Sequence, residues 1–260
     1  MNEQAKVAVI TGAGQGIGRR IAEVLGQEGY SLVLNDLLSP CDTLTCIRDF
    51  GVEAVEVLGD ISREDTALAI TATVHARFQR VDVLVNNAGI SHISPAEKTS
   101  AADFRRVLEV NLLGPFQLSR SIGSLMLKQN EGSIINIASV AGLLGISDRA
   151  AYNASKHGLV GLTRTLAVEW GGRGVRCNAV CPGWVKTPMD DISQADRLYT
   201  DVDITNRVPM GRFAGTDDIA QAVAFLADPV KSGFINGQML SVDGGWFADG
   251  SWETLRLKHR

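Results

Sequence analysis

The sequence predicts an α/β protein in which helices cover both faces of a mostly parallel, seven-stranded sheet. Short runs of β-branched and apolar residues alternate with longer helical patterns, as in doubly wound folds. The strand candidates are nearly continuous apolar runs, which indicates burial on both faces of a parallel sheet. No repeat, low-complexity segment or Pro/Gly/Ser linker divides the chain, so we predict one domain over residues 1–260.

The elements follow in chain order from these patterns. Each strand is a short run rich in Val, Ile and Leu: Val7–Ile10, Ser31–Leu34, Ala54–Leu58, Val83–Asn86, Ser133–Ile137, Val175–Val180 and Gln238–Ser241. The predicted helices lie between them, at Gly16–Gln27, Thr43–Phe50, Glu64–Arg80, Ala102–Lys128, Ala150–Trp170 and Asp217–Leu226. The polar, acidic stretch 186–212 breaks the alternation and is either a binding lid or a solvated insertion.

Composition narrows the class of protein. The chain has 260 residues, 45% hydrophobic and 21% charged, with a net charge of -4; this is an ordinary soluble composition, and we expect no nucleic-acid partner. We find no apolar run of about 18 residues and no signal-peptide architecture, so we expect no membrane span and a cytoplasmic location. The four cysteines form no C-x-x-C pair, so we expect buried, reduced thiols and no metal site.

A glycine-rich turn follows the first predicted strand. Thr11, Gly12, Gly16 and Gly18 fill the pattern T-G-x-x-x-G-x-G, whereas the G-x-G-x-x-G fingerprint does not fit. Glycines let the backbone approach a pyrophosphate, which the positive end of the following helix attracts. A turn without a ligand is the alternative, but the strand before it and the helix after it favour a dinucleotide site.

Asp36 follows the second predicted strand, 18 residues past Gly18. A carboxylate at this place accepts hydrogen bonds from the adenosine ribose hydroxyls and repels a 2′-phosphate. Gln15 and Leu37 stand where a basic residue would favour NADP. We therefore expect NAD as the cofactor.

Tyr152 and Lys156 stand four residues apart in a predicted helix. Their side chains share one face, with about 6 Å of rise between them. A cation beside a tyrosine favours the phenolate and lowers the pKa of the phenol from its reference value near 10. Such a phenol can exchange a proton with a substrate hydroxyl or carbonyl. The pair alone is weak evidence, because Tyr and Lys at this spacing are usually surface residues.

Motifs spread over nearly the whole chain occur in one order: Thr11-Gly12…Gly16…Gly18, Asp60, Asn86-Asn87-Ala88-Gly89, Asn111, Ser139, Tyr152…Lys156 and Pro182-Gly183. In this order they resemble the short-chain dehydrogenase/reductase family of the compact, single-domain kind. The resemblance covers about residues 5 to 247. It implies a Rossmann fold and hydride transfer between an alcohol or ketone and a nicotinamide.

The resemblance also implies roles for residues. The catalytic tetrad would be Asn111, Ser139, Tyr152 and Lys156. Tyr152 would be the general acid/base, Lys156 would lower its pKa and bind the nicotinamide ribose, and Ser139 would polarise the substrate carbonyl. Asn111 would kink its helix and hold a water molecule. The implied cofactor contacts are Thr11, Gly12, Gln15, Gly16, Ile17, Gly18, Asp36, Asp60, Ile61, Asn87, Ala88, Gly89, Tyr152, Lys156, Pro182, Gly183, Val185 and Thr187.

The expected substrate contacts are Ser91, His92, Ser139, Tyr152 and Trp184. A polar mouth favours a polyol, sugar or hydroxy acid, although Leu143, Leu144 and Trp184 leave an apolar pocket open, and His92 is otherwise an exposed loop residue. The predicted function is NAD(H)-dependent oxidation of such a secondary alcohol. The alternatives are a 3-oxoacyl-carrier-protein reductase using NADPH, against which Asp36 counts, and a catalytically silent NAD(H)-sensing regulator, which the complete tetrad disfavours.

The resemblance implies a homotetramer, with helices 102–128 and 150–170 forming one interface. The chain continues past Gly245 into a C-terminal extension, residues 246–260, which holds Trp246 and Trp252. Tryptophans are costly to expose and are enriched at interfaces. We therefore expect the extension to pack on a neighbouring subunit.

Overall fold

A seven-stranded sheet forms the centre of the computed structural model, which describes residues 5–186 and 200–251. The strand order is β3-β2-β1-β4-β5-β6-β7, and every pairing between neighbours is parallel. The sheet expected to be mostly parallel is therefore entirely parallel among these residues. The chain winds outward from β1 in both directions, so the order reverses between β1 and β4.

The observed strands match the predicted ones to within one or two residues at an end. They are β1 (Val7–Thr11), β2 (Ser31–Asp36), β3 (Ala54–Leu58), β4 (Val83–Asn86), β5 (Gly132–Ile137), β6 (Val175–Pro182) and β7 (Met239–Val242). Three of the extensions matter for function, because Thr11, Asp36 and Pro182 become the last residues of their strands. These residues therefore lie at the carboxyl edge of the sheet.

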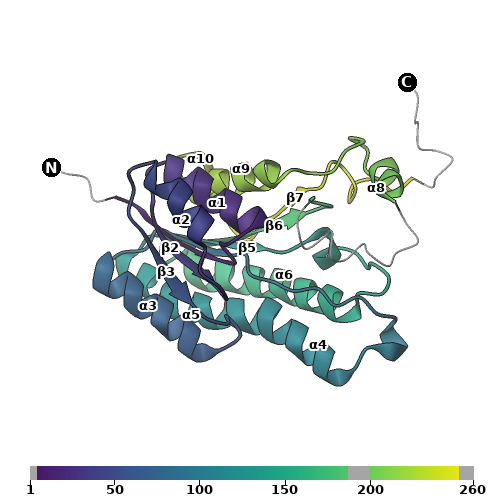
Figure 1. Ribbon diagram of the computed structural model, residues 1–260, viewed down its shortest axis with the longest axis horizontal. Coiled ribbons are helices and arrows are strands. Elements are labelled where there is room, and N and C mark those ends of the chain that lie inside the picture. The colour runs from purple at the N-terminus through teal and green to yellow at the C-terminus, as the bar shows by residue number, and fades with distance from the viewer. Residues whose placement is uncertain (1–4, 187–199, 252–260) are drawn as a thin grey trace.

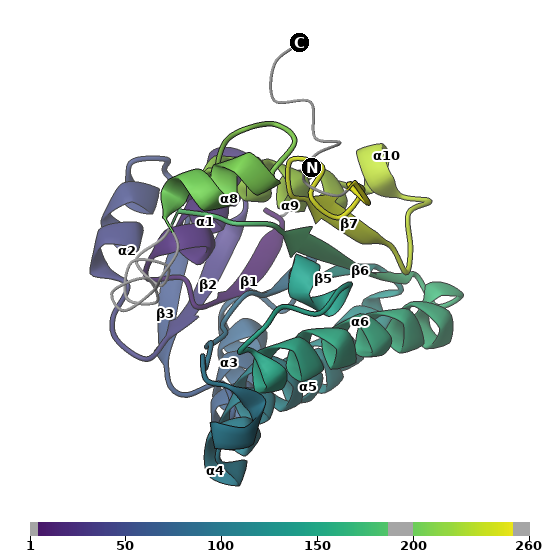
Figure 2. The same cartoon turned by 90° about the vertical axis from the view of Figure 1, so that its right-hand side faces the viewer.

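Two layers of helices enclose the sheet (Figures 1 and 2). One layer holds α1 (Gly16–Gln27), α2 (Cys41–Arg48), α9 (Thr216–Ala227) and α10 (Pro229–Ser232), and the other holds α3 (Glu64–Arg77), α4 (Ala101–Leu108), α5 (Gly114–Gln129) and α6 (Ala150–Gly171). The described elements also include the short helix α8 (Asp201–Arg207) and the 3₁₀ turns Ala96–Lys98 and Val140–Gly142. Sequence patterns did not predict α8 or α10.

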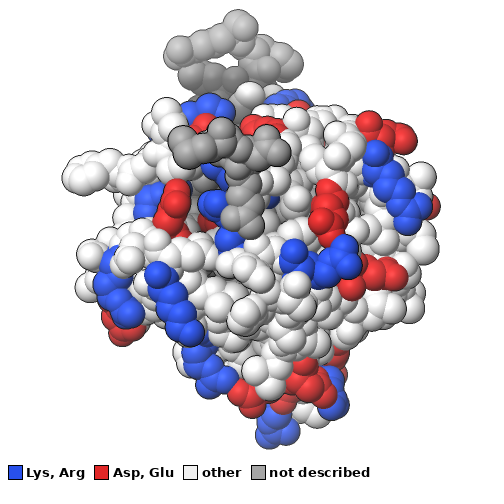
Figure 3. All heavy atoms as spheres, turned by 90° about the vertical axis from the view of Figure 1, so that its left-hand side faces the viewer, with Lys and Arg blue, Asp and Glu red and all other residues white. Residues whose placement is uncertain are grey.

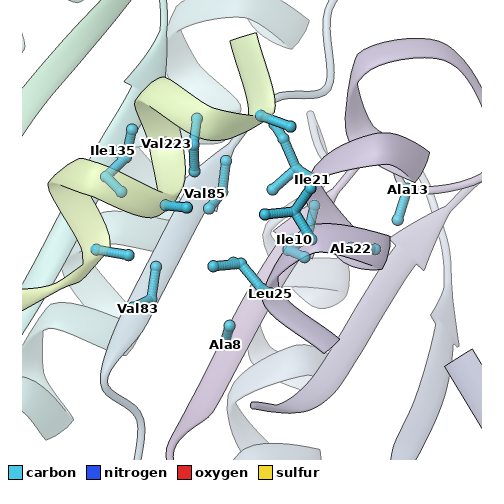
Figure 4. Close-up of a cluster of buried hydrophobic side chains, with 14 of the residues drawn as sticks. Ala8, Ile10, Ala13, Ile21, Ala22, Leu25, Val83, Val85, Ile135 and Val223 are labelled. Atoms are coloured by element: carbon cyan, nitrogen blue, oxygen red, sulfur yellow. The ribbon is translucent and has the colours of Figure 1, made fainter. Parts of the chain in front are cut away.

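Alternate residues of β1 enter two different cores, which explains why the strand is uniformly apolar. Ala8 and Ile10 pack with α1 and α9, whereas Val7 and Val9 pack with α3 and α5. Figure 4 shows the first of these clusters, where Ile21 and Leu25 of α1 and Val223 of α9 point toward the strands. The strand side chains that face them are Ile10, Val83, Val85 and Ile135. Each large side chain fully buried in this way contributes roughly 1.5–3 kcal/mol.

The helix predicted over Ala102–Lys128 is interrupted. Between α4 and α5 the backbone forms a π-helical turn, Glu109–Leu113. Asn111 lies in this turn with its side chain fully buried. Single π turns inside helices are frequent at functional sites. The kink that the resemblance implied at Asn111 is thus a π turn.

Two other predicted helices are wrong at their ends. α2 begins and ends two residues earlier than Thr43–Phe50, and Gly51 in the turn that follows has φ 72°. α3 ends at Arg77 rather than Arg80, because Gln79 adopts a left-handed conformation with φ 59° that a helix cannot continue. Cys177 and Cys181 are buried as expected, but Cys41 is exposed.

Charged side chains of both signs are interspersed on the face shown in Figure 3. Many of the described ones form exposed ion pairs, such as Arg63 with Asp65. Exposed pairs of this kind contribute little to stability. Over residues 5–186 and 200–251, no helix combines the length and the apolar character that a membrane span requires, and no group of three or more His, Cys, Asp or Glu side chains could hold a metal ion.

Gly18→Ala tests the close packing of α1 on the turn before it. The added Cβ would lie 2.0 Å from the Gly12 carbonyl oxygen and 2.5 Å from Asn87 Nδ2, so the turn must shift. We expect a loss of about 3 kcal/mol of unfolding free energy, measured by urea denaturation. The matched control is Gly172→Ala after α6, where a Cβ meets nothing within 4 Å; we expect a change of about 0.5 kcal/mol or less. Equal losses in both variants would contradict this packing.

Candidate active site

A cavity of about 470 Å³ opens at the carboxyl ends of the strands. Residues that follow β1 to β6 line it, so it lies across the point where the strand order reverses. Open α/β sheets bind their ligands at this place. The volume is in the range of small-molecule sites, about 300–1,000 Å³.

The glycine turn after β1 forms one wall of the cavity. Gly12 and Gly16 have φ 65° and 55°, which glycine adopts without steric cost. Gln15 precedes the first residue of α1, and no side chain caps this end of the helix. Backbone N–H groups of the first turn are therefore presented at the cavity wall, where they can bind an anion such as a pyrophosphate.

Thr11 lies behind this wall rather than on it. Its Oγ1 accepts hydrogen bonds from the N–H groups of Asn87 and Ala88, each at 3.0 Å. In return, Asn87 Nδ2 donates to the carbonyl oxygens of Thr11 at 2.9 Å and Gly12 at 3.0 Å. Thr11 thus joins the turn after β1 to the turn after β4, and its side chain holds two loops that line the cavity.

Asp36 places a carboxylate on the cavity wall at the end of β2. Its Oδ2 accepts from the N–H of Gly14 at 2.7 Å, and its Oδ1 accepts from the N–H of Leu37 at 2.7 Å. Two backbone donors therefore fix the carboxylate, which can still accept hydrogen bonds from ligand hydroxyls.

Asp60 is held by a pair of side chains that sequence patterns did not single out. Arg106 Nη2 donates to Asp60 Oδ2 at 2.6 Å, and Ser62 donates to Oδ1 through its N–H and Oγ at 2.9 and 2.8 Å. Burial by itself would raise the pKa of Asp60, but the hydrogen bonds from Ser62 and Arg106 outweigh it and lower the pKa. The carboxylate is thus kept ionised beside the cavity.

Tyr152, Ser139 and Lys156 meet at the other end of the cavity. Ser139 follows β5, and its Oγ accepts from the N–H of Ala141 at 3.1 Å, which leaves the hydroxyl proton to donate. Tyr152 and Lys156 come from the first turns of α6. The Lys156 ammonium lies 5.6 Å from the centroid of the Tyr152 ring.

Lys156 is almost fully buried, with 4% of its surface exposed. Its Nζ donates to the carbonyl oxygen of Ile137 at 2.7 Å. Because burial disfavours the ammonium form, the pKa of Lys156 falls from 10.5 to about 8. The lysine is therefore close to a change of charge at mildly alkaline pH.

The pKa of Tyr152 differs in direction from the one that the Tyr–Lys spacing predicted. Burial raises the pKa of this phenol, while a hydrogen bond with Ser139 and the charge of Arg149 lower it less strongly. The prediction considered only a neighbouring cation and ignored desolvation, which opposes the phenolate. The phenol is thus predominantly protonated at neutral pH.

Asn111 does not line the cavity but supports it from behind. Its Oδ1 accepts from the N–H of Ile90 at 2.8 Å, and its Nδ2 donates to the carbonyl oxygen of Ile90 at 2.9 Å and to Ser155 Oγ at 3.1 Å. The π turn brings this side chain between the loop after β4 and helix α6. Asn111 thereby fixes the distance between the cofactor loop and the helix that carries Tyr152.

Most of the predicted site residues line the cavity. From the cofactor set these are Gly12, Gln15, Gly16, Ile17, Gly18, Asp36, Asp60, Ile61, Asn87, Ala88, Gly89, Tyr152, Lys156, Pro182, Gly183 and Val185, and from the substrate set Ser91, Ser139, Tyr152 and Trp184. Thr11 and Asn111 are buried behind the wall. His92 is half-buried but is not a lining residue, and Thr187 lies outside the described residues.

The lining residues that the predicted site set lacks include Arg106, Arg149 and Trp246. Arg149 stands three positions before Tyr152, a helical spacing that could have revealed it. Arg106 and Trp246 come from distant segments, and no local pattern marks them. Trp246 belongs to the C-terminal extension, but it stacks on Trp184 of its own chain, with ring centroids 6.0 Å apart. Packing of the extension on a neighbouring subunit stays a prediction, and Trp252 lies outside the described residues.

The chain is similar to known proteins over nearly its whole length. A family model described as Enoyl-(Acyl carrier protein) reductase matches residues 12–247. An uncharacterized short-chain type dehydrogenase/reductase of Sinorhizobium fredii is 40% identical over 248 residues, which are 95% of this chain but 44% of that protein. An uncharacterized oxidoreductase of Thermotoga maritima is 39% identical over 252 residues, 94% of this chain and 98% of the relative.

The chain belongs to the short-chain dehydrogenase/reductase family. One solved structure of this family, provisionally described as an NAD(P) dependent gluconate 5-dehydrogenase from Beutenbergia cavernae with NADP bound at low occupancy, has 41% identity and a TM-score of 0.88, over 95% of this chain and 98% of that one. As a short-chain dehydrogenase/reductase, the protein is an oxidoreductase that acts on alcohol or ketone groups with a nicotinamide dinucleotide.

Lys156→Met tests the cost of burying the ammonium group. With a folded pKa of about 8 against 10.5, the unfolded chain binds more protons than the folded one between these pH values, so wild-type stability rises with pH across this window. Between pH 8 and 10.5, we expect the unfolding free energy of the wild type to rise by about 3 kcal/mol relative to that of Lys156→Met. Urea denaturation measures this difference.

The matched control is Lys231→Met, which removes a lysine that is more than half exposed. A difference between wild type and Lys156→Met that stays constant with pH would show that the Lys156 ammonium is not destabilised by burial.

Proposed function

We propose that the protein is an NAD(H)-dependent oxidoreductase that transfers hydride between a secondary alcohol and the nicotinamide, with Tyr152 as general acid/base. The observation that carries this proposal is the placement of the Tyr152 phenol, hydrogen-bonded with Ser139, on a cavity wall that also presents Lys156. A polyol, a sugar or a hydroxy acid is the proposed substrate class.

The chain's own residues fit a nicotinamide dinucleotide. The uncapped start of α1 suits the pyrophosphate, Asp36 suits the adenosine ribose, and Asp60 suits a hydrogen-bond donor on the adenine. Ala88 and Gly89 line the path between these groups and Tyr152. The glycines at positions 12, 16 and 18 keep the turn free of side chains, so the backbone can approach the ligand.

A bound nicotinamide would supply the hydride chemistry. The chain's residues handle the proton: Tyr152 donates it to a substrate carbonyl oxygen or takes it from a hydroxyl, and Ser139 hydrogen-bonds the same oxygen. Because burial raises the pKa of Tyr152, the protonated phenol serves ketone reduction near neutral pH. Alcohol oxidation needs the phenolate and should therefore become faster as the pH rises.

The preference for NAD rests on the surroundings of Asp36. The basic residues that line the described part of the cavity are Arg106, Arg149 and Lys156. Arg106 pairs with Asp60. Arg149 directly precedes α6 and Lys156 lies in its second turn, on either side of Tyr152 in the sequence. A 2′-phosphate would thus meet a carboxylate at Asp36. Two solved relatives, the Beutenbergia protein and one from Agrobacterium tumefaciens at 33% identity, are described with bound NADP, so NADP is the alternative to be tested.

The relatives are named for different alcohol and ketone substrates, so they do not select one substrate for this chain. A cis-4-hydroxycyclohexanecarboxylate dehydrogenase of Sinomonas cyclohexanicum and a D-threitol dehydrogenase of Mycolicibacterium smegmatis are each 37% identical. A 3-oxoacyl-[acyl-carrier-protein] reductase of Synechocystis is 36% identical, which keeps the NADPH-dependent reductase as the second candidate. The assembled Ser139–Tyr152–Lys156 group disfavours a catalytically silent NAD(H) sensor.

We also propose the homotetramer that the resemblance implied. A shallow apolar groove lies between α4, the π turn and α6, lined by Leu108, Leu112, Leu113, Phe116 and Leu162 among others. Leu113 and Phe116 are each about two-fifths exposed. Apolar side chains gathered on one face are typical of subunit interfaces.

Tyr152→Phe removes the phenol proton and leaves the ring. We expect kcat/KM for alcohol oxidation to fall by about 10²–10⁴-fold, while binding of NADH, measured by its fluorescence, stays close to the wild type. Tyr30→Phe is the matched control, because Tyr30 is buried in the core beside α1 and does not line the cavity. Full activity in Tyr152→Phe would reject Tyr152 as the acid/base.

Asp36→Ala tests the choice of cofactor. The variant loses the hydrogen bonds that ribose hydroxyls would donate to a charged acceptor, each worth about 1.5–3 kcal/mol, so kcat/KM for NAD should fall by about 10–100-fold. At the same time, the ratio of kcat/KM for NADP to that for NAD should rise, because the repulsion of the 2′-phosphate is removed. A wild type that already prefers NADP would overturn the NAD proposal.

A further inference from the structure

A column of two arginines and two tryptophans stands at the substrate end of the cavity. The Arg149 guanidinium lies over the Trp184 ring, 5.3 Å from its centroid. Trp184 stacks on Trp246 with an angle of 9° between the ring planes. Arg207 of α8 lies over the Trp246 ring at 5.8 Å, so we call these four side chains the Arg–Trp column.

The Arg–Trp column joins four segments that are distant in the sequence. Arg149 precedes α6, Trp184 follows β6, Trp246 follows β7, and Arg207 ends α8. At the outer end, Arg207 donates to Asp249 Oδ2 at 3.0 Å and to its carbonyl oxygen at 3.2 Å. Asp249 therefore neutralises Arg207, and the outer end of the column is held by an ion pair.

The inner end of the column reaches the reaction centre. Arg149, Trp184 and Trp246 line the same cavity as Tyr152 and Ser139. The positive charge of Arg149 also acts on the Tyr152 phenol, where it partly opposes the rise in pKa that burial causes. The backbone of Arg149 is fixed as well, because it forms a bridge with Ser94 and starts the helix that carries Tyr152.

We propose that Arg149 is the receptor for a substrate carboxylate, so that the secondary alcohol is a hydroxy acid and its oxidised form a keto acid. This inference rests on the proposed function and narrows its substrate class. A guanidinium over an indole ring is held in orientation by the ring, and its planar N–H donors match both oxygens of a carboxylate. The two indole rings also exclude water from one side of the pair, which strengthens the attraction.

A singly charged group fits this end better than a phosphate. Of the described basic residues that line the cavity, Arg149 and Lys156 stand beside Tyr152. Lys156 is almost fully buried and donates to the Ile137 carbonyl oxygen. Arg149 is therefore the guanidinium beside Tyr152, and its single positive charge matches a carboxylate.

The test compares acids with their neutral amides. Gluconate, lactate and 3-hydroxybutyrate, each with its primary amide, are assayed with NAD on wild type, Arg149→Gln, Arg149→Lys and the control Arg77→Gln. Arg77 is exposed, pairs with Glu53 and does not line the cavity. We expect the wild type to prefer at least one acid over its amide, and Arg149→Gln to lose about 10²-fold in kcat/KM for that acid.

The pattern across variants separates charge from geometry. Arg149→Lys should recover only part of the loss, because an ammonium keeps the charge without the planar fork, and Arg77→Gln should behave as the wild type. The readout is the ratio of kcat/KM for an acid to kcat/KM for its amide. A general loss of folding or of hydride transfer lowers both values and leaves this ratio unchanged. Equal use of acids and amides by the wild type, retained preference in Arg149→Gln, or a preference for glycerol 3-phosphate over every acid would overturn the proposal.

A binding measurement separates this proposal from the proposed function. Each acid is titrated into the NADH-saturated enzyme while tryptophan fluorescence is followed, since Trp184 and Trp246 lie beneath the bound carboxylate. A saturable change that disappears in Arg149→Gln supports Arg149 as the carboxylate receptor. If the same enzyme turns over no alcohol, the proposed function is rejected but the receptor is not. Turnover of neutral alcohols without any saturable change would reject the receptor and leave the proposed function standing.

Discussion

The hydrogen bonds between the turns after β1 and β4 are the interaction on which the rest of the site depends. Thr11 Oγ1 and Asn87 Nδ2 join the two turns at the place where the strand order reverses. Gly18 lets α1 start directly against this junction, since a Cβ there would overlap the Gly12 carbonyl oxygen. The start of α1, the Asp36 carboxylate and the Asn87–Gly89 loop are thereby held in one frame. Their positions follow from β1 and β4 being adjacent and parallel, which places both carboxyl ends at the same edge.

The proposed catalytic chemistry uses polar groups, Tyr152 and Lys156, whose charged forms are disfavoured. Burial raises the pKa of Tyr152 and lowers that of Lys156 to about 8, so both groups are shifted toward neutrality. Asn111 fixes the spacing between the loop after β4 and α6 through hydrogen bonds to Ile90 and Ser155. The desolvation that costs stability at Lys156 also brings its pKa near physiological pH, as perturbed groups at functional sites often do.

The proposed substrate end of the cavity is organised differently from the proposed cofactor end. The cofactor end presents backbone N–H groups and carboxylates on rigid strand ends, whereas the substrate end is formed by aromatic and cationic side chains from four segments. Trp246 belongs to the part of the chain that continues beyond the last strand, and its stacking on Trp184 brings that part to the cavity. The same family frame can thus serve different alcohols, because the loops beyond the strand ends change without disturbing the junction of β1 and β4.

Local patterns in the sequence determined the strands, most helices, the glycine turn and the order of the motifs, because period-2 and period-3.6 burial and turn chemistry act over a few neighbouring residues. They also placed Asp36, Ser139 and Tyr152 at the ends of elements, and the cavity is lined by those residues. Only the tertiary structure decided that Asn111 lies in a π turn, that Arg106 pairs with Asp60, and that Arg149 and Trp246 face the substrate end. It also decided the direction of the Tyr152 pKa, since burial outweighs the charges around the phenol. Desolvation, ion pairing and stacking depend on residues that are distant in the chain and meet only after folding, and no spacing within one segment contains that information.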